Sequence, residues 1–131
     1  MSFTLDMQNF ISKTERDADK VFRGTALGMF SRIVTRTPVK TGRLRANWIP
    51  SINKQSNRTT KRTDKSGGLT ITAINAVTGK GGVGDTLFLS NNLPYAQSIE
   101  DGSSKQAPAG MVKITVTELQ REVDKQARKL R

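Results

Sequence analysis

The stretch TPVKTGRLRANW, Thr37–Trp48, divides the chain into its main parts. Pro38 disfavours the α conformation in the residue before it, so a helix arriving from upstream has to end there. Thr41 and Gly42 suit a turn, and beyond them apolar and basic side chains alternate with a period of two. The alternation predicts a β-strand with one apolar and one basic face, and it places Trp48 in the core.

Upstream of this stretch, apolar residues recur at helical spacing from Met7 to Ile33, with charged residues between them. The spacing predicts one long amphipathic helix that ends near Arg36. Gly24 and Gly28 weaken the pattern, because glycine costs a helix about 1 kcal/mol relative to alanine. Alternatively, these glycines mark the close packing of another element.

Downstream, Ser51–Gly68 has almost no apolar residue, which predicts a loop that stays mobile unless a partner orders it. Leu69–Val77 and Thr86–Ser90 are rich in β-branched and apolar residues, as is typical of strands. A short helix is expected after Pro94, with Gly102 as its natural stop.

A second long helix, starting at Met111 or Val112, is expected to close the chain. Pro50 either ends the first strand or places it at the edge of a sheet. The expected fold is therefore α+β in one domain, residues 1–131. It has a long N-terminal helix, a small antiparallel sheet with long mobile loops, a short helix and a long C-terminal helix.

The glycine-rich segment KGGVGDT, Lys80–Thr86, invites comparison with phosphate-binding loops. The P-loop needs Ser or Thr after its lysine, where this chain has Gly81. A variant loop, that of partitioning-type ATPases, reads KGGVGKT, and Asp85 replaces its second lysine with a repulsive charge. A phosphate loop also opens a helix, whereas Thr86 opens a strand-like run.

We therefore expect no nucleotide binding at this segment. Residues 77–85 are expected to form a flexible hairpin tip instead, because glycines supply the positive φ angles that turns need. As a candidate docking loop, this tip comprises Gly79, Lys80, Gly81, Gly82 and Gly84.

The chain has 22 basic and 11 acidic residues, a net charge of +11. From Arg32 to Lys65, ten basic residues stand against the single acid Asp64, a net +9. Such a field attracts polyanions, above all nucleic acid, although a solvated loop that serves solubility would look the same. The candidate residues facing DNA or a partner are Lys54, Arg58, Lys61, Arg62 and Lys65.

Catalytic and metal chemistry have little support in the composition. The chain contains no cysteine and no histidine, which excludes disulfides and thiolate metal sites and removes the commonest general base. Glu100 lies near the end of the expected short helix, where negative charge is unfavourable. We therefore expect Glu100 to form an ion pair with Arg43 or Arg45. No catalytic residue, cofactor or metal is expected.

The apolar runs fall far short of the roughly 18 residues that cross a bilayer, so no membrane segment is expected. The first ten residues lack the apolar core of a signal peptide. Synthesis and assembly in a cytoplasm are therefore expected.

Two segments, in this order and at this distance, resemble the tail-completion or neck proteins of tailed bacteriophages. The first is TPVKTGRLRANW, and the second is LPYAQSIEDG, Leu93–Gly102. The family's pattern looks like T-P-x-x-T-G-x-L-R, then a short strand ending in Asn, then P-Y-A-x-x-(I/V)-E-x-G. The matching positions here are Thr37, Pro38, Thr41, Gly42, Leu44, Arg45, Pro94, Tyr95, Ala96, Glu100 and Gly102.

These matching positions are expected to determine the fold rather than to take part in catalysis. The segment Ser103–Gly110 departs from the family, because it has no aromatic residue. The contacts that this segment makes in the family are therefore not carried over to this chain.

The resemblance implies a non-enzymatic virion component located in the neck, and in the host cytoplasm during assembly. Copies of the chain would form a ring, commonly of six, between the head connector or stopper and the tail terminator or tail tube. Genomic DNA would pass through the ring, with non-specific contact to its wall. The alternatives are another connector part, such as a stopper or tail terminator, and a free basic DNA-binding protein.

Overall fold

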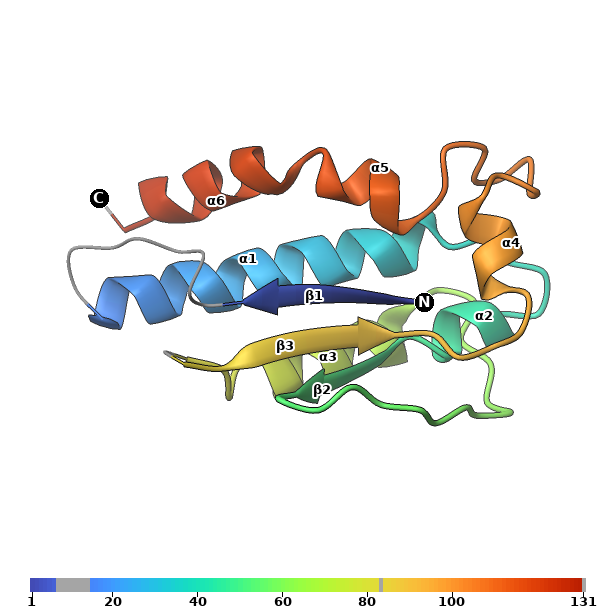
Figure 1. Cartoon of the computed structure of the whole chain (residues 1–131), viewed down its shortest axis with the longest axis horizontal. Helices are drawn as coiled ribbons and strands as arrows, with labels where there is room; N and C mark the ends of the chain where they lie inside the picture. Colours follow the sequence, from blue (N-terminus) through green and yellow to red (C-terminus); the bar gives the residue numbers. More distant parts are fainter. Residues whose placement is uncertain (7–14, 83, 131) are drawn as a thin grey trace.

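The computed structural model describes residues 1–6, 15–82 and 84–130. It has the expected α+β class, with helices packed on a small antiparallel sheet (Figure 1). The elements in chain order are β1 Ser2–Asp6, α1 Glu15–Arg36, α2 Arg43–Ala46, β2 Ile49–Ile52, α3 Gly68–Thr78, β3 Thr86–Ser90, α4 Ala96–Glu100, α5 Val112–Val116 and α6 Leu119–Arg128.

The sheet has the order β1-β3-β2, and both neighbours pair with β3 in antiparallel register. Phe88 at the centre of β3 lies opposite Thr4 on one side and Ser51 on the other. Leu87 and Leu89 point from β3 into the core, where both are fully buried. The sequence analysis missed β1, although Phe3 and Leu5 alternate with polar residues along it as in a strand with one apolar face.

Helix α1 forms the centre of the molecule, between α5 and α6 on one side and the sheet and α3 on the other (Figure 1). Its core face is built from Phe22, Met29, Phe30 and Ile33, all at most 1% exposed. Phe3 of β1 meets the edge of Phe30 with ring centroids 5.7 Å apart, a favourable aromatic geometry. These contacts join the sheet to the helix.

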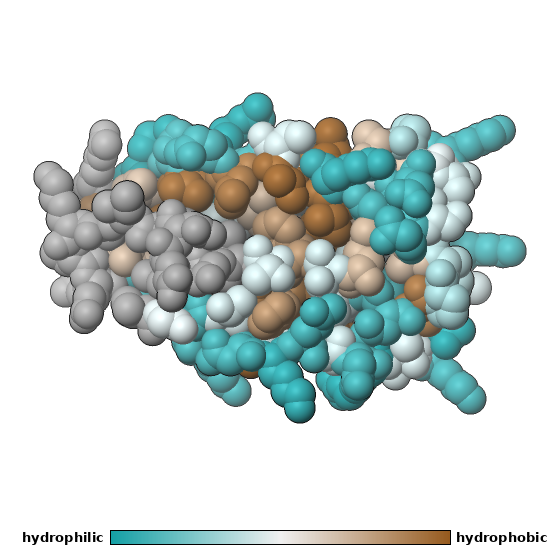
Figure 2. Space-filling model, viewed as in Figure 1, coloured by the Kyte–Doolittle hydropathy of each residue, from teal (hydrophilic) through white to brown (hydrophobic). Residues whose placement is uncertain are grey.

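The predicted end of this helix at Arg36 is confirmed. The first part of the predicted helix, residues 7–14, lies outside the described residues. Figure 2 shows apolar side chains gathered over α1, between α6 and β1, with hydrophilic side chains above and below them.

The predicted strand after Gly42 is wrong, because the chain forms the single helical turn α2 there. Gly42 has φ 90°, and this left-handed conformation leads the backbone into the turn. Leu44, Ala46 and Trp48 are nevertheless all buried, as predicted. A turn this short buries the same residues as a strand would, so the alternation could not distinguish them. Pro50 lies within the edge strand β2, one of the two outcomes expected for it.

The predicted strand over Leu69–Val77 is also wrong, because this segment forms α3. Its buried residues are Thr70, Ile74 and Thr78, which are spaced by four and form one helix face. The Asp64 carboxylate accepts hydrogen bonds from the Thr70 N–H at 2.8 Å and from the Gly67 N–H at 3.1 Å. This cap satisfies free N–H groups at the start of α3 and outweighs the β preference of its residues.

The KGGVGDT segment does not form a hairpin tip, because it connects α3 to β3. The expectation that a strand follows it is confirmed. Among the glycines of the candidate docking loop, only Gly84 has a positive φ; the others are Gly79, Gly81 and Gly82. Arg23 of α1 donates to the Gly81 carbonyl at 3.1 Å, and the Asp85 carboxylate accepts from the Gly82 N–H at 3.0 Å.

The predicted long C-terminal helix is two helices, α5 and α6, separated by Thr117 and Glu118. The Thr117 hydroxyl donates to the Ile114 carbonyl at 2.6 Å and competes with the backbone at the break. Gly102 follows α4 with φ 96°, which agrees with its predicted role as a helix stop. Residues 103–110 form the expected loop.

Candidate functional site

The two segments that carry the family resemblance meet in space. Asn91, between β3 and α4, donates from Nδ2 to the Leu44 carbonyl of α2 at 2.9 Å, and this contact is buried. The Trp48 indole donates to the Thr37 hydroxyl at 2.7 Å, and that hydroxyl donates to the Ile33 carbonyl at 2.7 Å. The first segment is thereby fixed to the end of α1 and to Asn91, whose Oδ1 in turn accepts the N–H of Leu93, at the start of the second segment, at 3.3 Å.

Arg45 closes the turn between α1 and α2. Its guanidinium donates to three carbonyls, those of Thr37 at 2.9 Å, Thr35 at 2.9 Å and Lys65 at 2.7 Å. A cation at the C-terminal end of α1 also complements the helix dipole. Arg45 therefore holds backbone, and it does not pair with Glu100.

Glu100 has a different partner from the one expected. Its buried carboxylate accepts the N–H groups of Met111 and Val112 at 2.8 Å each and that of Lys113 at 2.9 Å. The predicted ion pair with Arg43 or Arg45 is wrong, because the charge is compensated by the first N–H groups of α5. Glu100 joins the end of α4 to the start of α5.

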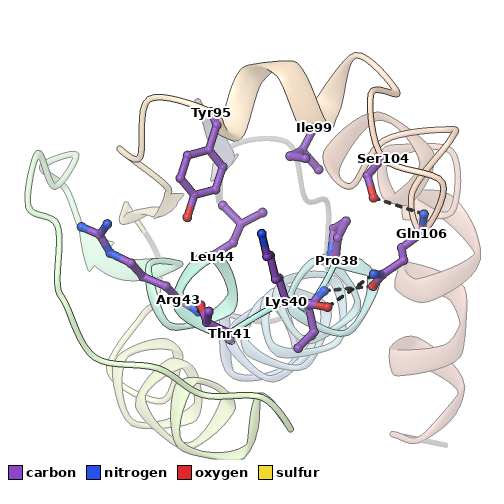
Figure 3. Close-up of a pocket in the computed structure, with 11 residues that line it drawn as sticks. Pro38, Lys40, Thr41, Arg43, Leu44, Tyr95, Ile99, Ser104 and Gln106 are labelled. Carbon is purple, nitrogen blue, oxygen red and sulfur yellow. Dashed lines mark hydrogen bonds between the residues drawn. The ribbon is translucent and has the colours of Figure 1, made fainter.

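An open hollow of about 630 Å³ lies between α2 and α4, and we call it the α2–α4 hollow. Its lining combines side chains of both resemblance segments with the 103–110 loop (Figure 3). The residues that shape it most are Pro38, Lys40, Leu44, Tyr95, Ile99 and Gln106. A hollow of this size is in the range of ligand-binding pockets.

One wall of the hollow is fastened by Gln106. Its Oε1 accepts the Val39 N–H at 2.9 Å, and its Nε2 donates to the Val39 carbonyl at 3.3 Å. The Ser104 hydroxyl accepts the Gln106 N–H at 3.1 Å, and Figure 3 shows these bonds on one side of the space. The 103–110 loop is thus tied to the first segment by two hydrogen bonds between the Gln106 side-chain amide and the backbone of Val39.

The polar side chains that line the hollow are either cationic or neutral. Lys40 and Arg43 contribute positive charge, and no aspartate, glutamate, histidine or cysteine lines the hollow. Within residues 1–6, 15–82 and 84–130, no group of three or more such side chains could hold a metal ion.

The basic residues predicted to face DNA or a partner all lie on the surface. The backbone of their segment is held by two asparagines. Asn47 accepts the Thr60 N–H at 2.9 Å and donates to the Thr60 carbonyl at 2.9 Å. Asn92 donates to the Ser56 and Arg58 carbonyls at 3.0 Å each. This fastening leaves the cations outward, and the sequence did not identify Asn47 and Asn92 as the residues that hold this loop.

The glycine connection lies at the other end of the molecule. It precedes β3 at the left of Figure 1, whereas α2 and α4 lie at the right. Gly79, Lys80 and Gly84 are exposed, and Gly81 is buried. The structure therefore brings the two resemblance segments together but keeps the candidate docking loop away from them.

Comparisons with protein-family models, with curated proteins and with solved structures found no match. Among the described residues, no helix is both long enough and apolar enough to span a membrane.

Proposed function

We propose that the chain is a structural subunit of the neck of a tailed phage, a tail-completion protein that joins the tail to the head connector. One observation carries the proposal: the two segments that resemble this family form opposite walls of the α2–α4 hollow. Asn91, which precedes the second segment, donates a buried hydrogen bond to the Leu44 carbonyl of the first segment.

The chemistry of the hollow supports a structural rather than an enzymatic role. Its lining consists of apolar side chains, hydroxyls, an amide and two cations. Such a surface suits contact with another protein, whose affinity comes from a few buried aromatic and cationic side chains. In the proposed assembly, copies of the chain form a ring, commonly of six, and dock on a stopper, tail terminator or tail tube.

The exposed cations of the segment before α3 support a position beside the DNA channel. Phosphate contacts position a protein without reading its base sequence, so a channel wall needs charge and no specific geometry. The same cations also favour the second candidate, a free basic DNA-binding protein. A free binder would hold duplex DNA at submicromolar strength as a monomer, with affinity falling steeply as salt rises.

Complementation tests the proposal. The purified protein is added to heads and tails from particles that fail to join for lack of it, and infectivity is measured. Restored infectivity together with weak duplex binding by the monomer is the expected result. Tight, salt-sensitive duplex binding without any restoration would contradict the neck function and favour the free DNA-binding protein.

A further inference from the structure

We infer that the α2–α4 hollow is a docking site for an acidic segment of a partner protein, one that presents a carboxylate beside an apolar side chain. The inference uses only the lining of the hollow, so it does not depend on the proposed neck function.

The floor and one side of the hollow are apolar. Leu44 lies at its base and is 6% exposed, while Pro38 and Ile99 are half-buried. Tyr95 is 44% exposed. These side chains offer an incoming apolar group a partly exposed apolar surface, and covering it would favour binding.

Two unpaired donors extend into the same space. Figure 3 shows the Lys40 ammonium and the Tyr95 hydroxyl directed into the hollow near Leu44. Among the described residues, neither group has an ion-pair or hydrogen-bond partner in the protein. Lys40 is exposed, so its ammonium is hydrated in the free protein. An ammonium can only donate, and its charge-assisted bonds to carboxylates or phosphates are stronger than bonds to neutral acceptors. The complement that suits this site is therefore an anionic group.

Charge decides which kind of partner fits. The lining contains Lys40 and Arg43 but no acidic side chain, so the local charge of the hollow is positive. DNA would satisfy Lys40 through its phosphates but would leave the apolar floor uncovered. A protein segment that carries a carboxylate beside an apolar side chain satisfies both parts of the site, because its charge is opposite to that of the lining.

The walls of the hollow are set before any partner arrives. Gln106 ties one wall to Val39, and Glu100 fixes the end of α4 against α5. A site with fixed walls loses little conformational freedom on binding, which favours affinity for a short segment.

Fluorescence anisotropy with a labelled peptide of alternating aspartate and leucine tests the inference at about 0.1 M salt. One control peptide carries asparagine for aspartate, and another carries serine for leucine. We expect the first peptide to bind at least about tenfold more tightly than either control. Failure of the first peptide to bind, or equal binding of the serine peptide, would overturn the inference.

Variants of exposed residues assign the binding to the hollow. We expect Lys40→Glu to weaken binding by about tenfold or more and Tyr95→Ala to weaken it severalfold. Lys129→Glu makes the same charge change beyond α6 and is expected to alter affinity by less than about twofold. Circular dichroism confirms the fold of each variant. Equal losses of peptide affinity for Lys40→Glu and Lys129→Glu would mean that binding depends only on net charge. That result would overturn the assignment of the binding site to the hollow.

Competition with a DNA duplex of about 20 base pairs tests whether the hollow binds nucleic acid instead of an acidic peptide. We expect Lys40→Glu to affect peptide binding far more than duplex binding. A duplex that displaces the peptide and loses affinity equally with Lys40→Glu would reassign the hollow to nucleic acid.

Discussion

At the scale of single residues, Arg45 and Glu100 of the two resemblance segments bind backbone rather than each other. Arg45 holds three carbonyls, and Glu100 holds three N–H groups. Gly42 is required for a similar reason, since a Cβ at its φ of 90° would lie 2.7 Å from the Lys65 nitrogen. These residues fix loops and helix ends that have little apolar surface of their own.

Replacing Glu100 by Gln tests the capping role. Gln keeps one carbonyl oxygen but turns an NH₂ group toward an N–H donor, so we expect a loss of about 1–3 kcal/mol in the free energy of unfolding. Urea denaturation measures it. In a double-mutant cycle with Arg45→Ala, the two losses should add within about 0.5 kcal/mol. A coupling energy well above that value would instead support the ion pair between Glu100 and Arg45 that the sequence predicted.

Asp64 predicts a dependence of stability on pH. Burial raises the pKa of its carboxyl, but hydrogen bonds from Thr70 and Gly67 and the charge of Arg62 outweigh burial and hold the pKa below its ordinary value of 3.8. A lowered folded pKa gives stability that is complete above the ordinary value and lost as pH falls through the lower one.

Asp64→Asn should therefore be less stable than the natural protein at neutral pH, by an amount that stays constant down to about pH 5. Below the ordinary pKa the difference should shrink, because the unfolded natural chain takes up a proton at Asp64 while the folded carboxylate resists protonation, and it should level off once the folded carboxyl is also protonated. Urea titrations at a series of pH values measure the difference. A gap that widens on acidification would show that the carboxylate is not stabilised in the folded protein.

Asp85 shows why KGGVGDT is not a phosphate loop. Its carboxylate accepts the Gly82 N–H and the Asn53 amide, and the chain continues into a strand. We expect Asp85→Lys, which creates the ATPase-like sequence, to lose about 1–2 kcal/mol of stability and to bind no ATP in calorimetric titration. Measurable ATP binding would refute this interpretation.

At the scale of elements, α5 and α6 are held to α1 largely by polar contacts. Arg36 binds both oxygens of Glu118, at 2.7 and 2.9 Å, and these bonds lower the pKa of Glu118. Arg32 pairs with Glu122 at 2.6 Å, and the Glu122 side chain is only 2% exposed. The two α1 glycines face α6, so the alternative that they mark close packing is confirmed.

The two glycines differ in what a methyl group would meet. A Cβ on Gly28 would lie 2.7 Å from the Glu122 carboxylate, which is buried and ion-paired. A Cβ on Gly24 would meet the end of the Gln126 side chain even more closely, but this half-buried amide is uncharged and could turn aside at the expense of its 2.7 Å bond to Glu122. Alanine gains about 1 kcal/mol in helix preference at either position.

Gly28→Ala should therefore lower the free energy of unfolding by about 1–3 kcal/mol, because disturbing a buried pair costs more than the helix gains. Gly24→Ala should leave it unchanged or raise it by up to about 1 kcal/mol. Urea midpoints of the matched pair measure the effects. Equal effects of the two substitutions would contradict the close contact at Gly28.

The sequence allowed prediction of the elements whose apolar spacing extends over several turns or a full strand. Helix α1 and strand β3 were predicted on that basis, and Pro38 set the end of α1. Helix α3 was missed because its start depends on Asp64, whose cap is a tertiary contact. Turn α2 was missed because a single turn has no period.

At the scale of the whole molecule, the candidate site arises from the meeting of two segments at one end of the fold (Figure 1). Each segment could be recognised in the sequence, but the hollow between them could not. Its walls depend on Asn91, Gln106 and the exposure of Tyr95, none of which follows from spacing. The exposed cations lie on a separate segment, so protein docking and DNA contact can occupy different surfaces.

Electron microscopy of joined particles tests the central claim most directly. Under the proposed neck function, the purified protein, marked with a label on its exposed surface, is added to isolated heads and tails of a tailed phage that fail to join without it. We expect a ring of labelled subunits at the joint between head and tail. Labelled protein found along free DNA or in the host nucleoid, with no density at the joint, would contradict the account.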